Sequence, residues 1–247
     1  MGGIKKFVWK AGNATSRKGI SYIIRAGNKR LIDWALEPFS YLYYKTFRSA
    51  KTFMFNGKSY KYFYHRYNTT WRNERAVEVP IVWEVVENYH GRRILEIGNV
   101  LSHYFDINHE VLDKYEKGDG VVNEDVVDFQ PSRKYDLIVS VSTLEHVGWD
   151  ENPREPMKIQ RAIEHLMECL ASPGKMMVTL PLGHNFAMEE LLHTGKLHFS
   201  RVYCMKRLPI STDNRWCETD LNQMTGVQYN HPFNNANGLV VGVIEKD

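Results

Sequence analysis

Short apolar segments alternate with longer helical stretches from residue 93 onward, and this alternation constrains the fold more than any other feature of the chain. A helical periodicity over residues 155–170, ended by Ser172-Pro173-Gly174, separates two of the apolar segments. Strands that alternate with helices are typical of βα units, whose strands lie parallel in one sheet. The sequence therefore predicts an α/β fold with seven strands, at residues 93–97, 110–113, 120–123, 137–141, 175–180, 199–208 and 239–245.

A further helix is predicted ahead of the first strand. Apolar residues recur from residue 77 to residue 86, Thr70 or Asn73 can cap the start, and His90-Gly91 ends the pattern. Pro80 is tolerated only near the first turn of such a helix. With 247 residues, 43% of them apolar, the chain is long enough for one sizeable core and too short for two full enzyme domains. We therefore expect a single domain over residues 61–247.

The first sixty residues differ from the rest in charge and composition. Residues 1–61 carry thirteen lysines and arginines and two acidic residues, a net charge of +11, whereas residues 62–247 carry a net charge of −8. Helical patterns at residues 20–24 and 31–36 are broken at Gly27-Asn28 and stop at Glu37-Pro38. The sequence predicts a basic, aromatic-rich, helical N-terminal extension over residues 1–60. It can lie on an anionic membrane surface or pack on the acidic domain.

No segment approaches the roughly 20 consecutive apolar residues that a membrane-spanning helix needs. Lys5, Lys6 and Lys10 interrupt any apolar run of the kind found in a signal peptide. The three cysteines are an odd number without a Cys-x-x-Cys pair, which argues against a disulfide framework and a zinc knuckle. We expect a cytoplasmic protein, with the inner face of the membrane as a second possibility.

Polar residues follow the predicted strands at the positions where each strand ends. Leu95-Glu96-Ile97-Gly98 ends the first strand, Asp113 the second, and Asp125 comes just after the third. The fourth, Tyr-Asp-Leu-Ile-Val at residues 135–139, leads into Leu-Glu-His-Val at residues 144–147. Ligands of open parallel sheets bind at the carboxyl ends of the strands, so these positions predict a binding site.

This succession, which covers roughly residues 75–182, resembles the class I S-adenosylmethionine-dependent methyltransferases. The resemblance implies a Rossmann-like, mostly parallel sheet with helices on both faces, and S-adenosylmethionine as the cofactor. It implies that Gly98 is the glycine closest to the cofactor and that Glu96 faces the methionine ammonium directly or through water. The other implied cofactor-binding residues are Asp113 at the ribose hydroxyls, Asp125 with Val126 at the adenine edge, and Ser140 to Ser142 at the amino acid part.

Residues 98–103 read Gly-Asn-Val-Leu-Ser-His and keep only the first glycine of a Gly-x-Gly-x-x-Gly turn. A nicotinamide dehydrogenase needs that turn to bind a pyrophosphate, so its loss argues against such an enzyme. The same loss departs from the methyltransferase consensus and leaves the path of residues 99–103 open. A cofactor-binding relative without catalysis therefore stays an alternative.

Histidines are the candidate catalytic residues, because a hydroxyl acceptor needs a base that removes its proton. His184, which follows the fifth strand, and His146, which follows the fourth, rank ahead of His231. The chain lacks an Asn/Asp-Pro-Pro-Tyr motif, a Pro-Cys pair, and an acidic cluster after the fourth strand that could hold magnesium. These absences favour metal-independent methylation of oxygen, with no metal ligand in the chain.

Aromatic and amide residues flank the predicted site on both sides. Tyr67, Arg72, Trp216 and Asn230 are the candidate substrate-binding residues, a combination that suits a sugar, glycan or glycolipid hydroxyl. An aromatic cap on the sheet edge explains the same residues without a substrate. Residues 1–55 are a candidate for peripheral membrane contact. Another small molecule or RNA is an alternative acceptor, although the acidic domain argues against a nucleic acid partner.

Overall fold

The computed structural model describes residues 36–209 and 213–247, in two compact units, Met1–Arg48 and Ser49–Asp247. In the first unit residues 36–47 are helical, so Glu37 and Pro38, where the sequence predicted a stop, lie in a helix. Tyr43 and Phe47 are four residues apart and their ring centroids lie 5.8 Å apart, a contact that favours the helix. The helical patterns predicted for residues 20–24 and 31–35 lie outside the described residues.

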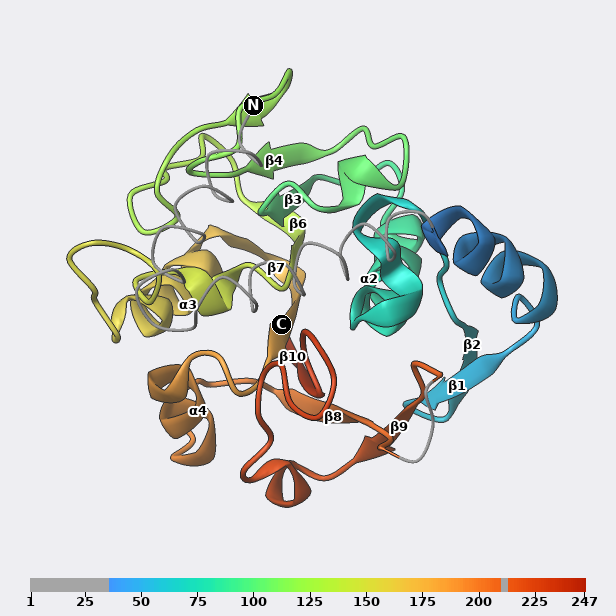
Figure 1. Cartoon of the computed structure of the whole chain (residues 1–247). Helices are drawn as coiled ribbons and strands as arrows, with labels where there is room; N and C mark the ends of the chain where they lie inside the picture. Colours follow the sequence, from blue (N-terminus) through green and yellow to red (C-terminus); the bar gives the residue numbers. More distant parts are fainter. Residues whose placement is uncertain (1–35, 210–212) are drawn as a thin grey trace, which may run out of the picture. The chain divides into compact units, whose positions relative to one another are not determined.

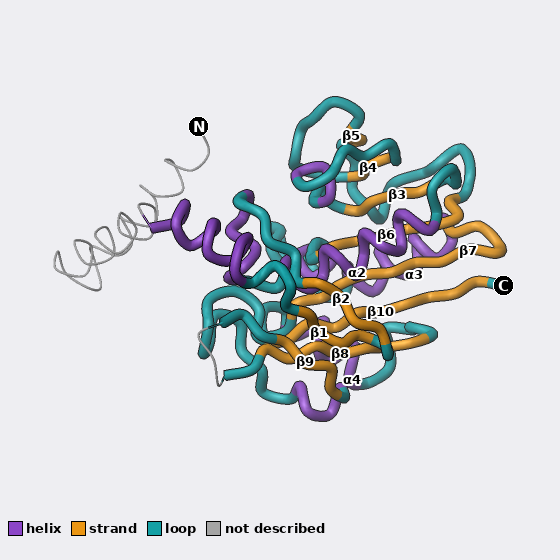
Figure 2. Tube along the Cα trace, turned by 90° about the vertical axis from the view of Figure 1, so that its right-hand side faces the viewer, coloured by secondary structure: helices purple, strands orange, loops and turns teal. Residues whose placement is uncertain are grey.

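The second unit contains a mixed sheet of eight strands in the order β5-β4-β3-β6-β7-β10-β8-β9, which Figure 2 shows from top to bottom. The strands β5 to β7 at one side run parallel, and β10 is antiparallel to both of its neighbours. The described strands of this sheet are β3 (Ile94–Ile97), β4 (Glu110–Leu112), β5 (Val121–Val122), β6 (Tyr135–Val141), β7 (Leu170–Pro181), β8 (Arg201–Arg207), β9 (Trp216–Thr219) and β10 (Gly238–Lys246).

The eighth strand corrects the predicted number of seven. β9 pairs antiparallel with β8, with Arg207 opposite Trp216 and Cys204 opposite Thr219. β9 is only four residues long and buries Trp216 alone at the sheet edge, a signal too short to separate from a loop by periodicity.

A separate two-stranded hairpin precedes the sheet. β1 (Thr52–Phe55) and β2 (Lys58–Lys61) pair antiparallel across Asn56-Gly57, both of which have positive φ (48° and 74°), as two-residue hairpin turns require. Phe53 and Phe55 are buried in the core beside α2 (Arg75–Asn88). Residues 49–60 of the predicted extension therefore pack as part of the second unit.

Helices cover both faces of the sheet. Figure 1 shows α2 on one side, and α3 (Lys158–Cys169) with α4 (Phe186–His193) on the other. β6 illustrates why its sequence reads as an unbroken apolar run: Ile138 packs with α3 and α4, whereas Leu137 and Val139 pack with α2. The packing of the two cores against the sheet fixes where each strand ends, and hence the positions of the residues that follow.

The connections among β3, β4, β5 and β6 differ from the predicted βα units. In the described residues the only helical turn there is η2 (Leu101–His103), a 3₁₀ turn after β3. α3 begins at Lys158 rather than near residue 155, and β7 already begins at Leu170. α2 matches its predicted range, and the side chain of Asn73 accepts a hydrogen bond from the Arg75 N–H (3.0 Å) at its start.

Within the described part of the chain, we find no helix whose length and apolar content would let it cross a membrane.

Candidate functional site

The strand order of the parallel region reverses between β3 and β6. β4 and β5 lie beyond β3, and β7 lies beyond β6, so the loops after β3 and β6 leave the sheet next to each other. In open α/β sheets this switch point is where ligands bind. Gly98 follows β3 there, and Ser142 and Thr143 follow β6.

Gly98 is the position where the two loops touch. Its φ is +84°, and its N–H donates to the carbonyl of Leu112 (2.8 Å) at the end of β4. A Cβ atom at this position would lie 2.7 Å from Cγ2 and 2.8 Å from Cβ of Thr143. Both the backbone angle and the space therefore require glycine.

Glu96 lies wholly buried below this turn. Its Oε1 accepts hydrogen bonds from the N–H groups of Val100 (2.9 Å) and Leu101 (2.8 Å), and its Oε2 lies 2.9 Å from Nε2 of His109. These contacts hold the loop after β3, a role that the sequence did not reveal because His109 lies thirteen residues away. The contact of Glu96 with a cofactor stays a prediction.

Asp113, at the end of β4, ties its own loop to the loop after β3. Its Oδ1 accepts from the N–H groups of Tyr115 (2.8 Å) and Glu116 (2.7 Å), and its Oδ2 accepts from the Asn99 N–H (3.1 Å). Each carboxylate oxygen can accept two hydrogen bonds, so Oδ2 retains one acceptor position. The side chain is half-buried and can still meet one hydroxyl.

Asp125 belongs to a cluster of four charges. Its Oδ2 lies 2.7 Å from Nζ of Lys114 and 2.5 Å from Nζ of Lys158, and Glu151 lies 2.6 Å from the same Lys158 nitrogen. Burial alone would raise the pKa of Asp125, but the hydrogen bonds from the two lysines lower it to about 2. Val126 beside it is buried. Both lysines donate to Oδ2 of Asp125, so this oxygen has no acceptor position left for an adenine. The predicted contact of Asp125 with an adenine stays a prediction.

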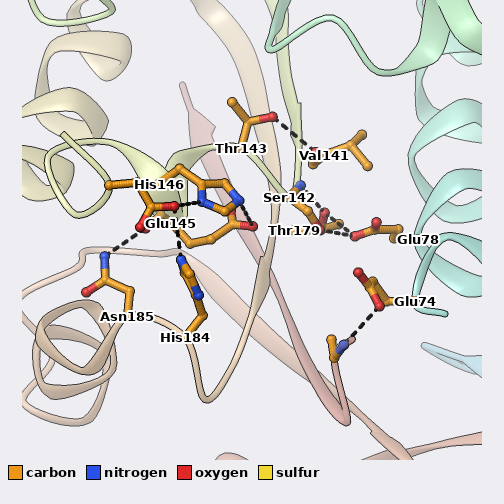
Figure 3. A network of polar contacts seen from close by, with 12 residues as sticks. Glu74, Glu78, Val141, Ser142, Thr143, Glu145, His146, Thr179, His184 and Asn185 are labelled. Carbon is orange, nitrogen blue, oxygen red and sulfur yellow. Dashed lines mark hydrogen bonds and ion pairs between the residues drawn. The ribbon is translucent and has the colours of Figure 1, made fainter. Parts of the chain in front are cut away.

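Ser142, directly after β6, contacts α2 and is not open to solvent. Ser142 has a φ of +44°, and its hydroxyl donates to Oε2 of Glu78 (2.6 Å), which also accepts from the Thr179 hydroxyl (2.8 Å; Figure 3). The Ser140 hydroxyl is buried without a hydrogen-bond partner among the described residues. The side chains of Ser140 and Ser142 thus face the protein interior. That their backbone groups contact the cofactor stays a prediction.

Three buried carboxyl groups surround one guanidinium beside this loop. Arg75 forms an ion pair with Glu78, and Glu74 and Glu145 lie close enough to both to affect their charges. Burial, followed by repulsion from Glu78, raises the pKa of Glu145 well above its ordinary value and raises the pKa of Glu74. Sequence reasoning missed this cluster, because Glu74 and Glu78 read as polar residues on the first turn of a helix.

The two predicted catalytic histidines come together over one carboxylate. Nδ1 of His146 lies 2.6 Å from Oδ2 of Asp150, and Nε2 of His184 lies 3.2 Å from the same oxygen (Figure 3 shows the two rings). The ring centroids are 5.0 Å apart. Burial lowers the pKa of His146 against the opposing effect of Asp150, which favours the neutral imidazole. Asp150 carried no sequence signal beyond its spacing of four residues from His146.

The predicted substrate residues differ in exposure. Tyr67 is exposed and stacks on His103 (ring centroids 4.3 Å apart), Asn230 is exposed in a turn with a φ of +64°, and Arg72 is half-buried. Trp216 is only 4% exposed, and its Nε1–H donates to Asn214 (2.8 Å). The buried ring agrees with the alternative of an aromatic cap at the sheet edge, and the contact of Trp216 with a substrate stays a prediction.

Comparison with known proteins identifies no family. No protein-family model matches the chain, and no curated protein does. Solved structures that match include a SAM-dependent methyltransferase from Archaeoglobus fulgidus (12% identity, 73% of this chain and 98% of that chain, TM-score 0.45) and TehB from Haemophilus influenzae (12%, 74% and 65%, 0.43). The N-methyltransferase NodS from Bradyrhizobium japonicum in complex with S-adenosyl-L-homocysteine also matches (12%, 63% and 78%, 0.38). At these identities and TM-scores the likenesses do not identify the reaction of this chain.

Proposed function

We propose that this protein is an S-adenosylmethionine-dependent methyltransferase. One observation carries the proposal: a glycine that cannot be replaced, Gly98, lies at the switch point of a parallel sheet, beside an acid that ends the neighbouring strand. The order of the acids along the chain, with its resemblance to class I methyltransferases, supports the same reading.

The residues present fit such a cofactor at two positions. Gly98 carries no side chain at the switch point, where Thr143 already occupies the position of a Cβ atom, and Asp113 retains an acceptor position for a ribose hydroxyl. When bound, the cofactor supplies an electrophilic methyl group on a positively charged sulfur. The chain itself then has to orient the acceptor, exclude water and receive the acceptor's proton.

The acceptor that we propose is a hydroxyl group of a sugar, glycan or glycolipid. With the cofactor bound, transfer of its methyl group to the hydroxyl oxygen would require a base of the protein to take the hydroxyl proton. With no ion bound, the neutral imidazole of His146 can take that proton, while Asp150 and His184 hold its ring in place. Tyr67 and Asn230, both exposed, support a sugar, because an aromatic face packs on C–H groups and an amide bonds hydroxyls.

Calorimetry with S-adenosylmethionine and S-adenosylhomocysteine tests the cofactor. We expect one binding site per chain, and at least about ten-fold weaker binding in Asp113→Ala, because one lost charged hydrogen bond is worth roughly 1.5–3 kcal/mol. Asp119→Ala is the matched control, since Asp119 is an exposed acid six residues away. Equal affinities for Asp113→Ala and the wild type would remove the cofactor assignment.

A methyl-release assay on extracted sugars and glycolipids tests the acceptor. The product should be heavier by about 14 daltons, the mass of one methylene group, and the methyl group should be on oxygen. Cofactor binding without turnover on any such extract would instead favour a binding protein. The internal contacts of Glu96 and Asp125 are the observation in favour of that second candidate.

A further inference from the structure

His146, Asp150 and His184 present three ligand atoms to one point. The three atoms, a ring nitrogen from each histidine and a carboxylate oxygen, all lie within 4.8 Å of one another. The shared oxygen lies 2.6 Å from Nδ1 of His146 and 3.2 Å from Nε2 of His184. Two imidazoles and one carboxylate on one side of an ion are a common ligand set for divalent transition metals, with the other coordination positions left open.

We propose that His146, Asp150 and His184 bind one divalent transition-metal ion. The sequence predicted no metal, because that prediction considered only an acidic cluster of the kind that holds magnesium. Imidazole nitrogens prefer ions softer than Mg²⁺, so Zn²⁺ and Co²⁺ are the ions to test. The binding of the ion does not depend on the methyltransferase proposal.

Glu145 orients the first ligand. Nε2 of His146, the ring nitrogen on the far side from Nδ1, lies 3.4 Å from Oε1 of Glu145. Glu145 is 2% exposed, and its Oε2 has no hydrogen-bond partner among the described residues. A histidine that ligates a metal usually donates its other N–H to such a carboxylate, which fixes the ring and directs the lone pair to the metal. Here the other ring nitrogen, Nδ1, faces Asp150.

The backbone around the second ligand is also fixed. Gly183 has a φ of +84°, and a Cβ atom there would lie 2.6 Å from the carbonyl carbon of Gln228, so the loop before His184 packs tightly on its neighbour. On the other side of His184, the Asn185 side chain donates to the carbonyl of Glu145 (2.8 Å; Figure 3). This bond ties the loop of His184 to the loop of His146, so the site exists before an ion binds.

The site is open to an ion and to a further ligand. The side chains of His146 and Asp150 are about half exposed, at 50% and 46%. Both histidines follow strands of the parallel region, β6 and β7, at the same sheet edge as Gly98. An ion there would occupy the imidazole lone pairs and would itself bind the acceptor hydroxyl, lowering its pKa in place of a free histidine base.

Metal binding to the full-length protein tests this inference. The protein is stripped with a chelator, dialysed, and titrated with Co²⁺ and Zn²⁺, with calorimetry and the visible absorption of Co²⁺ as readouts. We expect one ion per chain, and at least about ten-fold weaker binding in His184→Ala and Asp150→Asn. His193→Ala, which removes an exposed histidine of α4, should bind within two-fold of the wild type. Glu145→Gln should bind about 10- to 100-fold more weakly, as for the outer partner of a ligating histidine.

Two results would overturn the inference: no saturable binding by the wild type, or equal binding by the wild type, His184→Ala and Asp150→Asn. Thermal unfolding of each variant without metal checks that it is folded. S-adenosylmethionine affinity, measured on the same stripped protein, separates the two proposals. Normal cofactor binding without ion binding rejects only the metal site, and the reverse result rejects only the cofactor assignment.

Discussion

Gly98 and Thr143 show how one contact between residues can specify a switch point. The glycine was predicted from its place in a motif, but its partner was not, because Thr143 lies 45 positions later and meets it only when β3 and β6 are adjacent. Glu96 illustrates the same limit. The sequence indicates that an acid stands at the end of the strand. Whether this acid contacts a ligand or a buried histidine, here His109, depends on tertiary packing.

Gly98→Ala should lower the free energy of unfolding by about 2–4 kcal/mol, since it adds backbone strain at positive φ to a steric overlap with Thr143. Urea unfolding measures the change. In the double variant Gly98→Ala, Thr143→Gly the overlap is removed and only the backbone strain remains, so part of the lost stability should return. No recovery would show that the contact with Thr143 is irrelevant to the loss.

Asp125 gives a prediction for the pH dependence of stability. Its pKa is about 2 in the folded protein and 3.8 in the reference state, so the ionised form is favoured by folding. The contribution, about 2 kcal/mol, is fully present above pH 4 and is lost as the pH falls towards 2. The stability difference between the wild type and Asp125→Asn, measured by urea unfolding, should therefore shrink between pH 6 and pH 3. A difference that stays constant over this range contradicts the ion-pair cluster.

At the scale of elements, apolar runs were enough for the strands of the parallel region and failed for the edge strand β9. β6 and residues 176–181 of β7 are largely buried and were predicted from mostly apolar runs. β5, with two residues, was also predicted, within residues 120–123, whereas the four residues of β9 offer no period to recognise. The crossovers of the first half were predicted to be helical, but among the described residues η2 is the only helical turn there.

α2 depends on a buried ion pair at its first turn. Glu78 pairs with Arg75 and accepts from the hydroxyls of Ser142 and Thr179, so it joins this helix to the ends of β6 and β7. Glu78→Ala should lower the free energy of unfolding by about 3–5 kcal/mol, because it leaves a buried guanidinium without its partner. Glu87→Ala, an exposed acid on the same helix, should change it by no more than about 0.5 kcal/mol. Thermal or urea unfolding of both variants tests the difference, and similar losses in the two would contradict it.

At the scale of the whole molecule, the chain divides its charge between two units. Residues 1–48 hold ten of the lysines and arginines, and the remaining sequence is acidic overall. That division could be read from composition alone.

Removal of residues 1–48 should therefore reduce binding to anionic vesicles. Each cation near such a surface contributes about 1 kcal/mol, so we expect at least about a ten-fold loss of partitioning to phosphatidylserine vesicles in co-sedimentation. Vesicles of neutral lipid are the control and should show no difference. Equal partitioning with and without these residues would contradict membrane binding by the basic unit. It would favour packing of this unit on the acidic domain or binding to another partner.

The two borders of the sheet also affect how the protein behaves at high concentration. β5 forms one border with two residues, and β9 forms the other with four, beside the β1–β2 hairpin. Aggregation through strand pairing needs a long row of unpaired backbone groups, and short borders offer little of it. Fibril formation by the folded second unit would thus have to begin with local unfolding of the chain, rather than with the stacking of intact molecules edge to edge.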